Sequence, residues 1–416
     1  LPCTYNEDTI IDLLKKHYPH EWKSVEYKKQ YYDQKDKYLI KRFGKARYKM
    51  PFAEELIRNN VKFKYLLSDK TKRNYSSSFD EDIWKKNKEA LWRERKNKIA
   101  RIDTKISNAK AKTQMVTPVF LDQLIGLYNR INTSQKDRMY IIHELKKYYN
   151  PKVIKFFLKL NDTELNKQLR EIAFYHLQSF NYQPRLRRQK YMQVHTKRKK
   201  RKEYLKKVYP YETYSIPHNP DELEYRIENG KEQKIKSYDY FISHSSKDSK
   251  LVQDIITYEN SVGKNIFCDW INDSDYLKRN LLCEATLKVI EWRLQQSKAI
   301  IFLRTHNSVE SVWCKYELNY FGELNKPIYY LDEDKVKSGD FALLKYDMEE
   351  SVEEESLMRG FQRWRKKMKK FVGIIVATVL AFSLVGCGPV DSAIQNIASS
   401  GSNTSSKSGV VTADDD

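Results

Sequence analysis

Four short apolar runs separated by helical patterns constrain the fold of this chain more than any other feature. The runs occupy residues 238–243, 266–270, 299–303 and 327–331, and the stretches between them place apolar residues at helical spacing. Strands that read as continuous apolar runs are buried on both faces, which is typical of a parallel sheet covered by crossover helices. The pattern therefore predicts a parallel α/β domain over residues 236–335.

Polar segments follow three of these strands, at residues 244–248, 269–275 and 304–311. In an open parallel sheet, ligands bind in the crevice beyond the carboxyl ends of the strands. Each polar segment falls at that end of the sheet, so we expect a functional site to be built from them.

The first 184 residues place apolar side chains at helical spacing and predict a mainly α-helical, basic region. Residues 82–112 form either a solvated helix or a connector. Four further helices are expected between residues 116 and 177, the second capped by Ser134 and the fourth by Asp162. A small bundle and a HEAT-like stack both fit these helices, and the absence of a repeated period favours the bundle.

Most of the positive charge lies outside the predicted sheet. The net charge of the chain is +22, yet residues 236–340 are close to neutral. Six consecutive basic residues form the densest run, namely Lys197, Arg198, Lys199, Lys200, Arg201 and Lys202. Such a run can neutralise several phosphates, which makes these residues candidate nucleic-acid contacts, and it can equally be a solvated basic connector. Prolines follow, and we interpret residues 185–235 as a basic, proline-containing linker.

Five cysteines are scattered along the sequence without a CxxC spacing or a Cys/His cluster of the zinc-binding type. We expect reduced thiols in a cytoplasmic protein, and no metal site is predicted. The chain begins with Leu1 and Pro2 rather than with methionine, so we expect further residues before them in the native protein.

Four sequence pieces in the sheet segment occur in the order of a known family. They are DYFISHSSKD at 239–248, FCDWIND at 267–273, RLQQSKAIIF at 293–302 and SVWCKYELNYF at 311–321. The segment resembles a TIR (Toll/interleukin-1 receptor) domain, most closely of the bacterial branch. The resemblance covers about 100 residues and implies a flavodoxin-like sheet preceded here by the mainly α-helical region.

The resemblance implies that the chain cleaves the bond between nicotinamide and ribose in NAD⁺, with NAD⁺ as a substrate and no cofactor. A carboxylate can hold the ribose hydroxyls and stabilise the oxocarbenium-like charge as nicotinamide leaves. Glu317 matches the family's catalytic glutamate. Trp313 lies one helical turn before it and matches a tryptophan that helps to form the family's substrate pocket. The other positions that match the family's site are Asp269, His244, Ser245 and Ser246, and for His244 a hydrogen bond within the turn is favoured over a role as base.

The family's other properties are implied in the same way. TIR domains self-associate to complete their sites, so oligomers are expected. The bacterial branch points to antiphage defence, with a helical region that senses or oligomerises. One departure is that Leu318 is followed here by NYFGE, where the bacterial branch often has GYFDG. The loss of a small residue puts fine packing in doubt more than catalysis.

Two alternatives remain open from the sequence. The TIR segment could be a non-catalytic module that recruits a partner, or the basic run between residues 185 and 207 could make the chain a nucleic-acid-binding protein. Neither the trigger of an activity nor the choice between a linear and a cyclic product is encoded in a readable motif.

The C-terminal part has a different composition. Residues 336–370 read as a charged linker, and residues 371–386 are mostly apolar but short for a spanning helix of about 20 residues. Together with Cys387 and a Ser/Gly-rich end, residues 371–416 resemble a bacterial lipoprotein leader, which belongs at an N-terminus. These residues are either an appended or mis-joined reading frame or a C-terminal membrane anchor. Membrane association is expected only if the apolar segment belongs to the native protein.

Overall fold

The structure is a computed structural model that describes residues 1–185, 188, 192–277 and 283–346. The apolar segment 371–386, most of the charged linker before it and the rest of the tail lie outside the described residues. Within the described ranges, no helix has both the length and the apolar character needed to cross a membrane.

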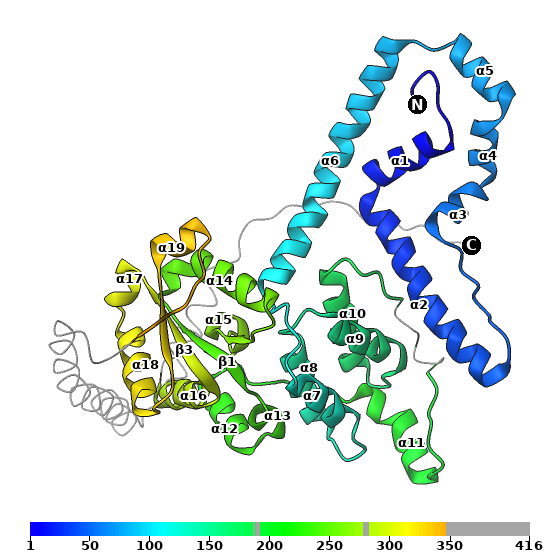
Figure 1. Cartoon of the computed structure of the whole chain (residues 1–416). Helices are drawn as coiled ribbons and strands as arrows, with labels where there is room; N and C mark the ends of the chain where they lie inside the picture. The colour runs from blue at the N-terminus through cyan, green and yellow to red at the C-terminus, as the bar shows by residue number, and fades with distance from the viewer. Residues whose placement is uncertain (186–187, 189–191, 278–282, 347–416) are drawn as a thin grey trace, which may run out of the picture. The chain divides into compact units, whose positions relative to one another are not determined.

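A five-stranded sheet forms the second half of the described chain, in the order β2-β1-β3-β4-β5 (Figure 1). The first four strands are parallel, and the last pairs antiparallel with β4. This is the strand order of flavodoxin-like folds, so the predicted fold class is confirmed, and the sheet extends past residue 335. The strands are β1 (Tyr238–Ser243), β2 (Ile266–Phe267), β3 (Ser297–Arg304), β4 (Ile328–Asp332) and β5 (Leu344–Lys345).

Helices cover both faces of the sheet because alternate strand residues point to opposite sides. Ile242 and Ile301 point to the face covered by α14 (Ser249–Ser261) and α19 (Glu333–Ser338). Phe241 and Ile300 point to the other face, which is covered by α16 (Glu284–Gln295) and α18 (Val312–Glu323) (Figure 1). The short elements η3 (Ser246–Asp248), α15 (Asp269–Asn272) and α17 (His306–Val309) follow strands β1, β2 and β3.

The second strand is shorter than the sequence pattern predicts. We expected it to run to Trp270, and that was wrong because the chain turns into α15 at Asp269. The side chain of Asn272 accepts a hydrogen bond from the backbone N–H of Cys268 at 2.9 Å, and the N–H of Asn272 donates to the Cys268 carbonyl at 2.7 Å. These local bonds close a helical turn directly after Phe267.

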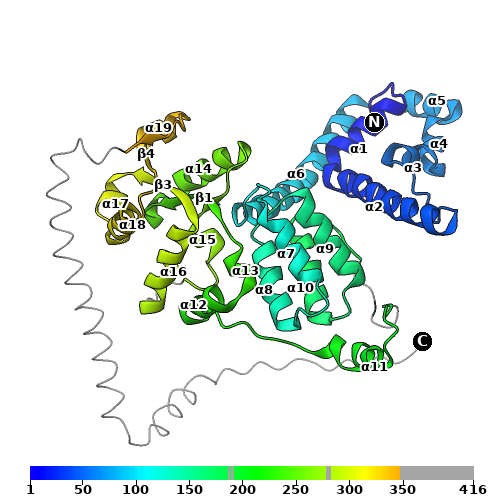
Figure 2. The same ribbon diagram turned by 60° about the horizontal axis from the view of Figure 1, so that its bottom comes forward.

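Before the sheet, four helices share one apolar core and lie side by side in both views (Figures 1 and 2). They are α7 (Phe120–Asn129), α8 (Gln135–Leu145), α9 (Pro151–Thr163) and α10 (Lys167–Ser179). Ser134 caps α8 as predicted. The predicted cap at Asp162 was wrong, because α9 continues past it and Asn166 caps α10 instead. Asp162 forms an ion pair with Lys35 at 2.8 Å.

The segment interpreted as a linker, residues 185–235, contains packed helices. α12 (Pro220–Asn229) buries Leu223 and Ile227 in the same core as α7–α10, and it also packs against α16 of the sheet domain. Tyr276 and Val289 of the sheet domain complete this core. The other elements of the segment are α11 (Lys199–Lys207), η2 (Tyr209–Tyr211) and α13 (Lys231–Lys234).

The N-terminal helices form a separate small core around Tyr5, Ile10, Ile11 and Phe63. Residues 82–111 belong to a helix rather than to a connector, Lys112 is its C-cap, and Arg95 is the one buried residue of this helix. The helices are α1 (Glu7–His17), α2 (Pro19–Phe43), α3 (Ala53–Arg58), α4 (Val61–Leu67), α5 (Asp69–Ser77) and α6 (Glu81–Ala111).

Candidate functional site

Glu317 reaches from α18 to the carboxyl end of the central strand β1. The hydroxyl of Ser243, the last residue of β1, donates a hydrogen bond to Oε2 of Glu317 at 2.6 Å. Ser243 is fully buried, and Glu317 is half-buried. Helix α18 is held in place by the Ser311 cap and by its packing on β1 and β3. Glu317 therefore lies at the sheet edge where a ligand is expected.

The environment of Glu317 disfavours its charged form. Burial raises the pKa of the Glu317 carboxyl to about 8, the negative charge of Asp269 adds to the rise, and the hydrogen bond from Ser243 opposes it. Within the described ranges, no cation forms an ion pair with this carboxyl. A carboxyl whose pKa is raised toward neutral pH by burial is frequently found in functional sites.

His244, directly after β1, is held in one tautomer. Nε1 of Trp270 donates to Nε2 of His244 at 3.1 Å, and Nδ1 of His244 lies 3.1 Å from the carbonyl of Ile242. Because an indole N–H can only donate and a carbonyl can only accept, the proton of the neutral ring is on Nδ1. Nε2 is thus occupied, as expected for a histidine that forms turn hydrogen bonds.

Asp269 is the first residue of α15 and is exposed, with its Oδ1 at 3.9 Å from Nε2 of His244. The possible ligand atoms of His244, Cys268 and Asp269 lie within 4.8 Å of one another, a spacing that a metal ion could bridge. However, burial raises the pKa of the Cys268 thiol well above its usual value, with a further contribution from the Asp269 charge. Metal binding needs the thiolate and a free imidazole nitrogen, so this trio suits a metal poorly.

The buried side chain of Asp248 fixes the loop after β1. This buried carboxylate accepts hydrogen bonds from Oγ1 of Thr305 at 2.6 Å and from Nδ2 of Asn307 at 2.8 Å, which tie the loop to the segment after β3. Ser245 caps the short η3 turn and is half-buried, whereas Ser246 is exposed. Both serines therefore lie in the loop after β1, which the hydrogen bonds of Asp248 hold in place.

Trp313 is half-buried one turn before Glu317 and packs against the apolar cluster of Phe241, Phe267 and Ile300. Its contacts join the helix to the sheet, and a role for the ring in substrate binding stays a prediction. Helix α18 runs without interruption through Asn319, where the sequence departs from the family pattern.

Sequence reasoning did not single out two residues of the site. Ser243 was assigned to the first strand. Its position as the last strand residue before a polar loop could have marked it as a site residue. Trp270 was assigned to a strand, so its contact with His244 was not foreseen. Both contacts join residues that are distant in sequence. Ser243 and Glu317 are separated by 74 positions, and Trp270 and His244 by 26.

The basic run lies elsewhere in the chain. Lys199 begins α11, and the run is exposed apart from the half-buried Arg201. As far as the chain is described, none of the six basic residues takes part in an ion pair. None of the six is among the described residues that interact with Glu317, which are Ser243, Asp269, Cys268 and Cys314.

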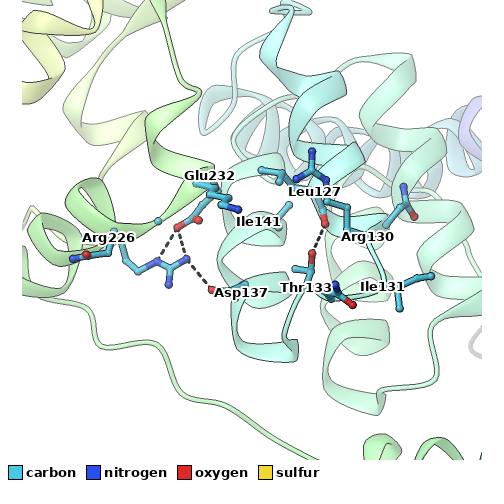
Figure 3. Close-up of a pocket in the computed structure, with 13 residues that line it drawn as sticks. Leu127, Arg130, Ile131, Thr133, Asp137, Ile141, Arg226 and Glu232 are labelled. Atoms are coloured by element: carbon cyan, nitrogen blue, oxygen red, sulfur yellow. Dashed lines mark hydrogen bonds and ion pairs between the residues drawn. The ribbon is translucent and has the colours of Figure 1, made fainter. Parts of the chain in front are cut away.

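A cavity of about 730 Å³ lies in the helical region rather than at the sheet edge (Figure 3). It is lined by the loop after α7 and by the joint between α12 and α13. At its side, Arg226 pairs with Glu232 at 2.6 Å and with Asp137 at 3.0 Å. None of the residues predicted for the NAD⁺ site lines this cavity.

Comparison with known proteins decides the family. The chain is 35% identical over 348 residues to a Cytobacillus dafuensis protein, and the alignment covers 84% of this chain and 89% of that protein. That protein carries the provisional name cyclic ADP-D-ribose synthase TIR2. The chain belongs to the bacterial TIR-domain proteins.

A second TIR relative is ThsB' of Bacillus cereus (strain MSX-D12), provisionally named a 3' cyclic ADP-D-ribose synthase. It is 32% identical over 95 residues, which is 23% of this chain and 49% of that protein. No family model and no solved structure matches the chain. Because the first alignment is far longer than the TIR domain, the relation to the Cytobacillus protein includes helical residues that precede it.

Proposed function

We propose that this TIR protein cleaves the bond between nicotinamide and ribose in NAD⁺, with Glu317 as the catalytic carboxylate. The observation that carries the proposal is the half-buried Glu317 at the carboxyl end of β1, bonded to Ser243 and with its pKa raised to about 8. The provisional names of the two relatives, both cyclic ADP-D-ribose synthases, support the same substrate class.

The electrostatics of the site fit this chemistry. The nicotinamide ring of NAD⁺ carries a positive charge, and a cation close to Glu317 favours the ionised carboxylate. The substrate therefore brings a positive charge to Glu317, which forms no ion pair with any cation of the described residues. As the bond breaks, its electron pair neutralises the pyridinium, positive charge moves to the ribose, and the Glu317 carboxylate stabilises it.

For the product, we propose a cyclic ADP-D-ribose, because both relatives are named for that product. In cyclisation, an oxygen or nitrogen of the same ADP-ribose attacks the ribose carbon, so NAD⁺ gives cyclic ADP-ribose, nicotinamide and a proton. In hydrolysis, water attacks instead and the product is linear ADP-ribose. Mass spectrometry separates the two, because the cyclic product is lighter by one water.

We also propose that the active form is an oligomer of this chain and that it acts in defence against phage. Family membership supports both statements. If neighbouring TIR domains complete the site, specific activity will rise with protein concentration, and analytical ultracentrifugation will show larger species over the same range. Constant specific activity across the range would argue for a complete site in one chain.

The proposal is tested by nicotinamide release from NAD⁺ with concentrated wild-type protein, Glu317→Gln and Glu317→Ala. We expect release by the wild type and a loss on the order of 100-fold or more in both variants. Circular dichroism and thermal unfolding check that the variants are folded. Equal release by wild type and variants would remove Glu317 from the reaction, and no release by any form would favour the non-catalytic interaction module.

A further inference from the structure

The side chain of Gln114, which lies between α6 and α7, pairs with the outer edge of strand β2. Its Nε2 donates to the carbonyl of Ile266, and its Oε1 accepts from the Ile266 N–H at 3.2 Å. Gln114 is fully buried, and 152 positions separate it from Ile266. A carboxamide from the helical region thus takes the place of a neighbouring strand.

Strand β2 needs such a partner because of its place in the sheet. It is two residues long and lies at the edge of the strand order, where its outer N–H and C=O groups have no strand to pair with. Ile266 is fully buried, so water cannot satisfy those groups. An unpaired buried backbone group costs about 1–3 kcal/mol, which makes the Gln114 contacts important for the position of β2.

Gln114 is itself held by the helical region. Its backbone N–H donates to the carbonyl of Lys147 at 2.9 Å, and its carbonyl accepts from the N–H of Tyr149 at 2.9 Å. The Gln114 backbone therefore pairs with the segment after α8 as in a parallel bridge, while its side chain pairs with β2.

Helix α15 is attached to the helical region at two points. Nε2 of Gln114 also donates to Oδ1 of Asn272, the last residue of α15, at 3.0 Å. Asp273, the next residue, lies 3.7 Å from Nζ of Lys147 and is paired with Arg293 at 2.7 Å. Asn272 and Asp273 are both almost completely inaccessible to solvent.

The same four-residue helix carries two groups of the candidate active site. Asp269 begins α15, and its charge contributes to the electrostatics of Glu317. Trp270 donates to His244 in the loop after β1. Both lie between the Ile266 contact and the Asn272 contact of Gln114, so a shift of that amide moves them together.

We propose that Gln114 is a positioning residue for the active site, through which the helical region sets the place of Asp269 and Trp270. The effect on catalysis rests on the proposed function, whereas the effect on α15 does not. In this arrangement the helical region is part of the framework of the site, and a displacement of residues 113–116 relative to the sheet is transmitted to α15.

The test compares Gln114→Leu with Asn166→Leu in the full chain. Asn166 is a matched control, because it is also a buried amide, and it bonds the carbonyls of Tyr209 and Glu212 and the N–H of Leu169 within the helical region. Hydrogen exchange is followed by mass spectrometry for peptides that cover residues 266–273, with residues 238–243 as the internal reference.

We expect exchange across 266–273 to become at least about tenfold faster in Gln114→Leu and to stay at the wild-type rate in Asn166→Leu. Unchanged exchange in Gln114→Leu, or equal acceleration in both variants, would overturn the proposal. If Gln114→Leu does not fold, Gln114→Glu replaces it, since its carboxylate keeps the Oε1 acceptor but places negative charge against the Ile266 carbonyl and Asn272 Oδ1.

Nicotinamide release supplies a second readout. We expect Gln114→Leu to lose on the order of 100-fold in activity, because a small misplacement of site groups is that costly, and its pH profile to move to lower pH. Glu317 faces Ser243, Cys314, Cys268 and Asp269. Of these groups, Asp269 moves away with α15, and the loss of its negative charge lowers the pKa of Glu317. A smaller amount of folded protein would lower the activity at every pH and would leave the profile where it is. Should the wild type release no nicotinamide, the proposed function fails and the exchange experiment still decides the role of Gln114.

Discussion

Two carboxyl groups of the TIR domain are withdrawn from water and respond in opposite ways. Asp273 is fully buried between Arg293 and Lys147, and these cations hold its pKa below the usual value. Glu317 has a hydroxyl partner, and burial raises its pKa to about 8. Burial alone therefore does not mark a functional carboxyl. The difference is the cation, which is built into the structure at Asp273 and which, under the proposed function, the substrate brings to Glu317.

The largest effect is expected when Asp273 loses Arg293, the closer of its two cationic neighbours. Arg293→Met leaves a buried charge without its bidentate partner, and we expect a loss of about 3–5 kcal/mol in the free energy of unfolding. Denaturant unfolding measures the loss. Lys298→Met, which removes an exposed pair with Asp239, is the control and is expected to cost less than about 1 kcal/mol.

A double variant sharpens that result. Asp273→Asn in the Arg293→Met background removes the buried charge that has lost its bidentate Arg293 partner, so part of the stability is expected to return. If the double variant is as unstable as Arg293→Met, packing around the Arg293 side chain rather than its charge accounts for the loss.

The second prediction concerns the pH dependence of stability. The pKa of Glu317 is raised from 4.5 in the unfolded chain to about 8 in the folded one. Its contribution to stability is therefore fully present below pH 4.5 and is lost as the pH rises through about 8. Between pH 5 and pH 9, the wild type should lose a few kcal/mol more than Glu317→Gln.

This pH difference is measured by unfolding both proteins at several pH values. For Asp273 the sign is reversed, because its lowered pKa gives stability that is present above pH 3.8 and lost on acidification. Parallel stability curves for the wild type and Glu317→Gln would mean that Glu317 is solvated in solution.

A smaller effect is expected at the Ser243 hydroxyl, which favours the charged form of Glu317. Ser243→Ala removes the hydrogen bond that lowers the pKa of Glu317, so that pKa rises further. The midpoint of the rise in nicotinamide release with pH should move to higher pH by an amount that corresponds to about 1 kcal/mol. Thr257→Ala, in an exposed helix position, is the control and should leave the profile unchanged. A shift to lower pH in Ser243→Ala would contradict the assigned role of the hydroxyl.

The smallest effect is expected in the basic run, which lies outside both carboxyl sites. Replacing Lys199, Lys200 and Lys202 by Gln should change the free energy of unfolding by less than about 0.5 kcal/mol and nicotinamide release by less than about twofold. The same variant tests the proposal of nucleic-acid binding, because loss of phosphate contacts weakens both binding and its salt dependence. Unchanged nucleic-acid binding by this variant would favour the alternative that the run is a solvated basic segment.

The sequence predicted the parts of the fold that depend on local apolar pattern. Strands β1, β3 and β4 and helix α18 are found where the pattern placed them. Strand β2 and α15 were not predicted correctly, because the turn at Asp269 depends on the Asn272 side chain, and the short strand is completed by a residue of the helical region.

The site shows the same limit. Glu317 could be singled out because it lies in a recognisable helix motif, and the structure brings it to the sheet edge with Asp269 and His244 nearby. Its partner Ser243 and the role of Gln114 could not be deduced, since hydrogen bonds between distant residues leave no periodic signal. The cap at Asp162 was misassigned because Asp and Asn are both good caps, and where α9 ends depends on its packing.

The attachment of β2 to Gln114 also bears on the order in which the protein is made. A ribosome releases the helical region first, so Gln114 and Lys147 emerge before Ile266 and Asp273, which they contact. Domains tend to fold in that order during synthesis. When strand β2 is synthesised, the Gln114 side chain that pairs with it has therefore already been translated, and the helical region can act as a template for this edge of the TIR sheet.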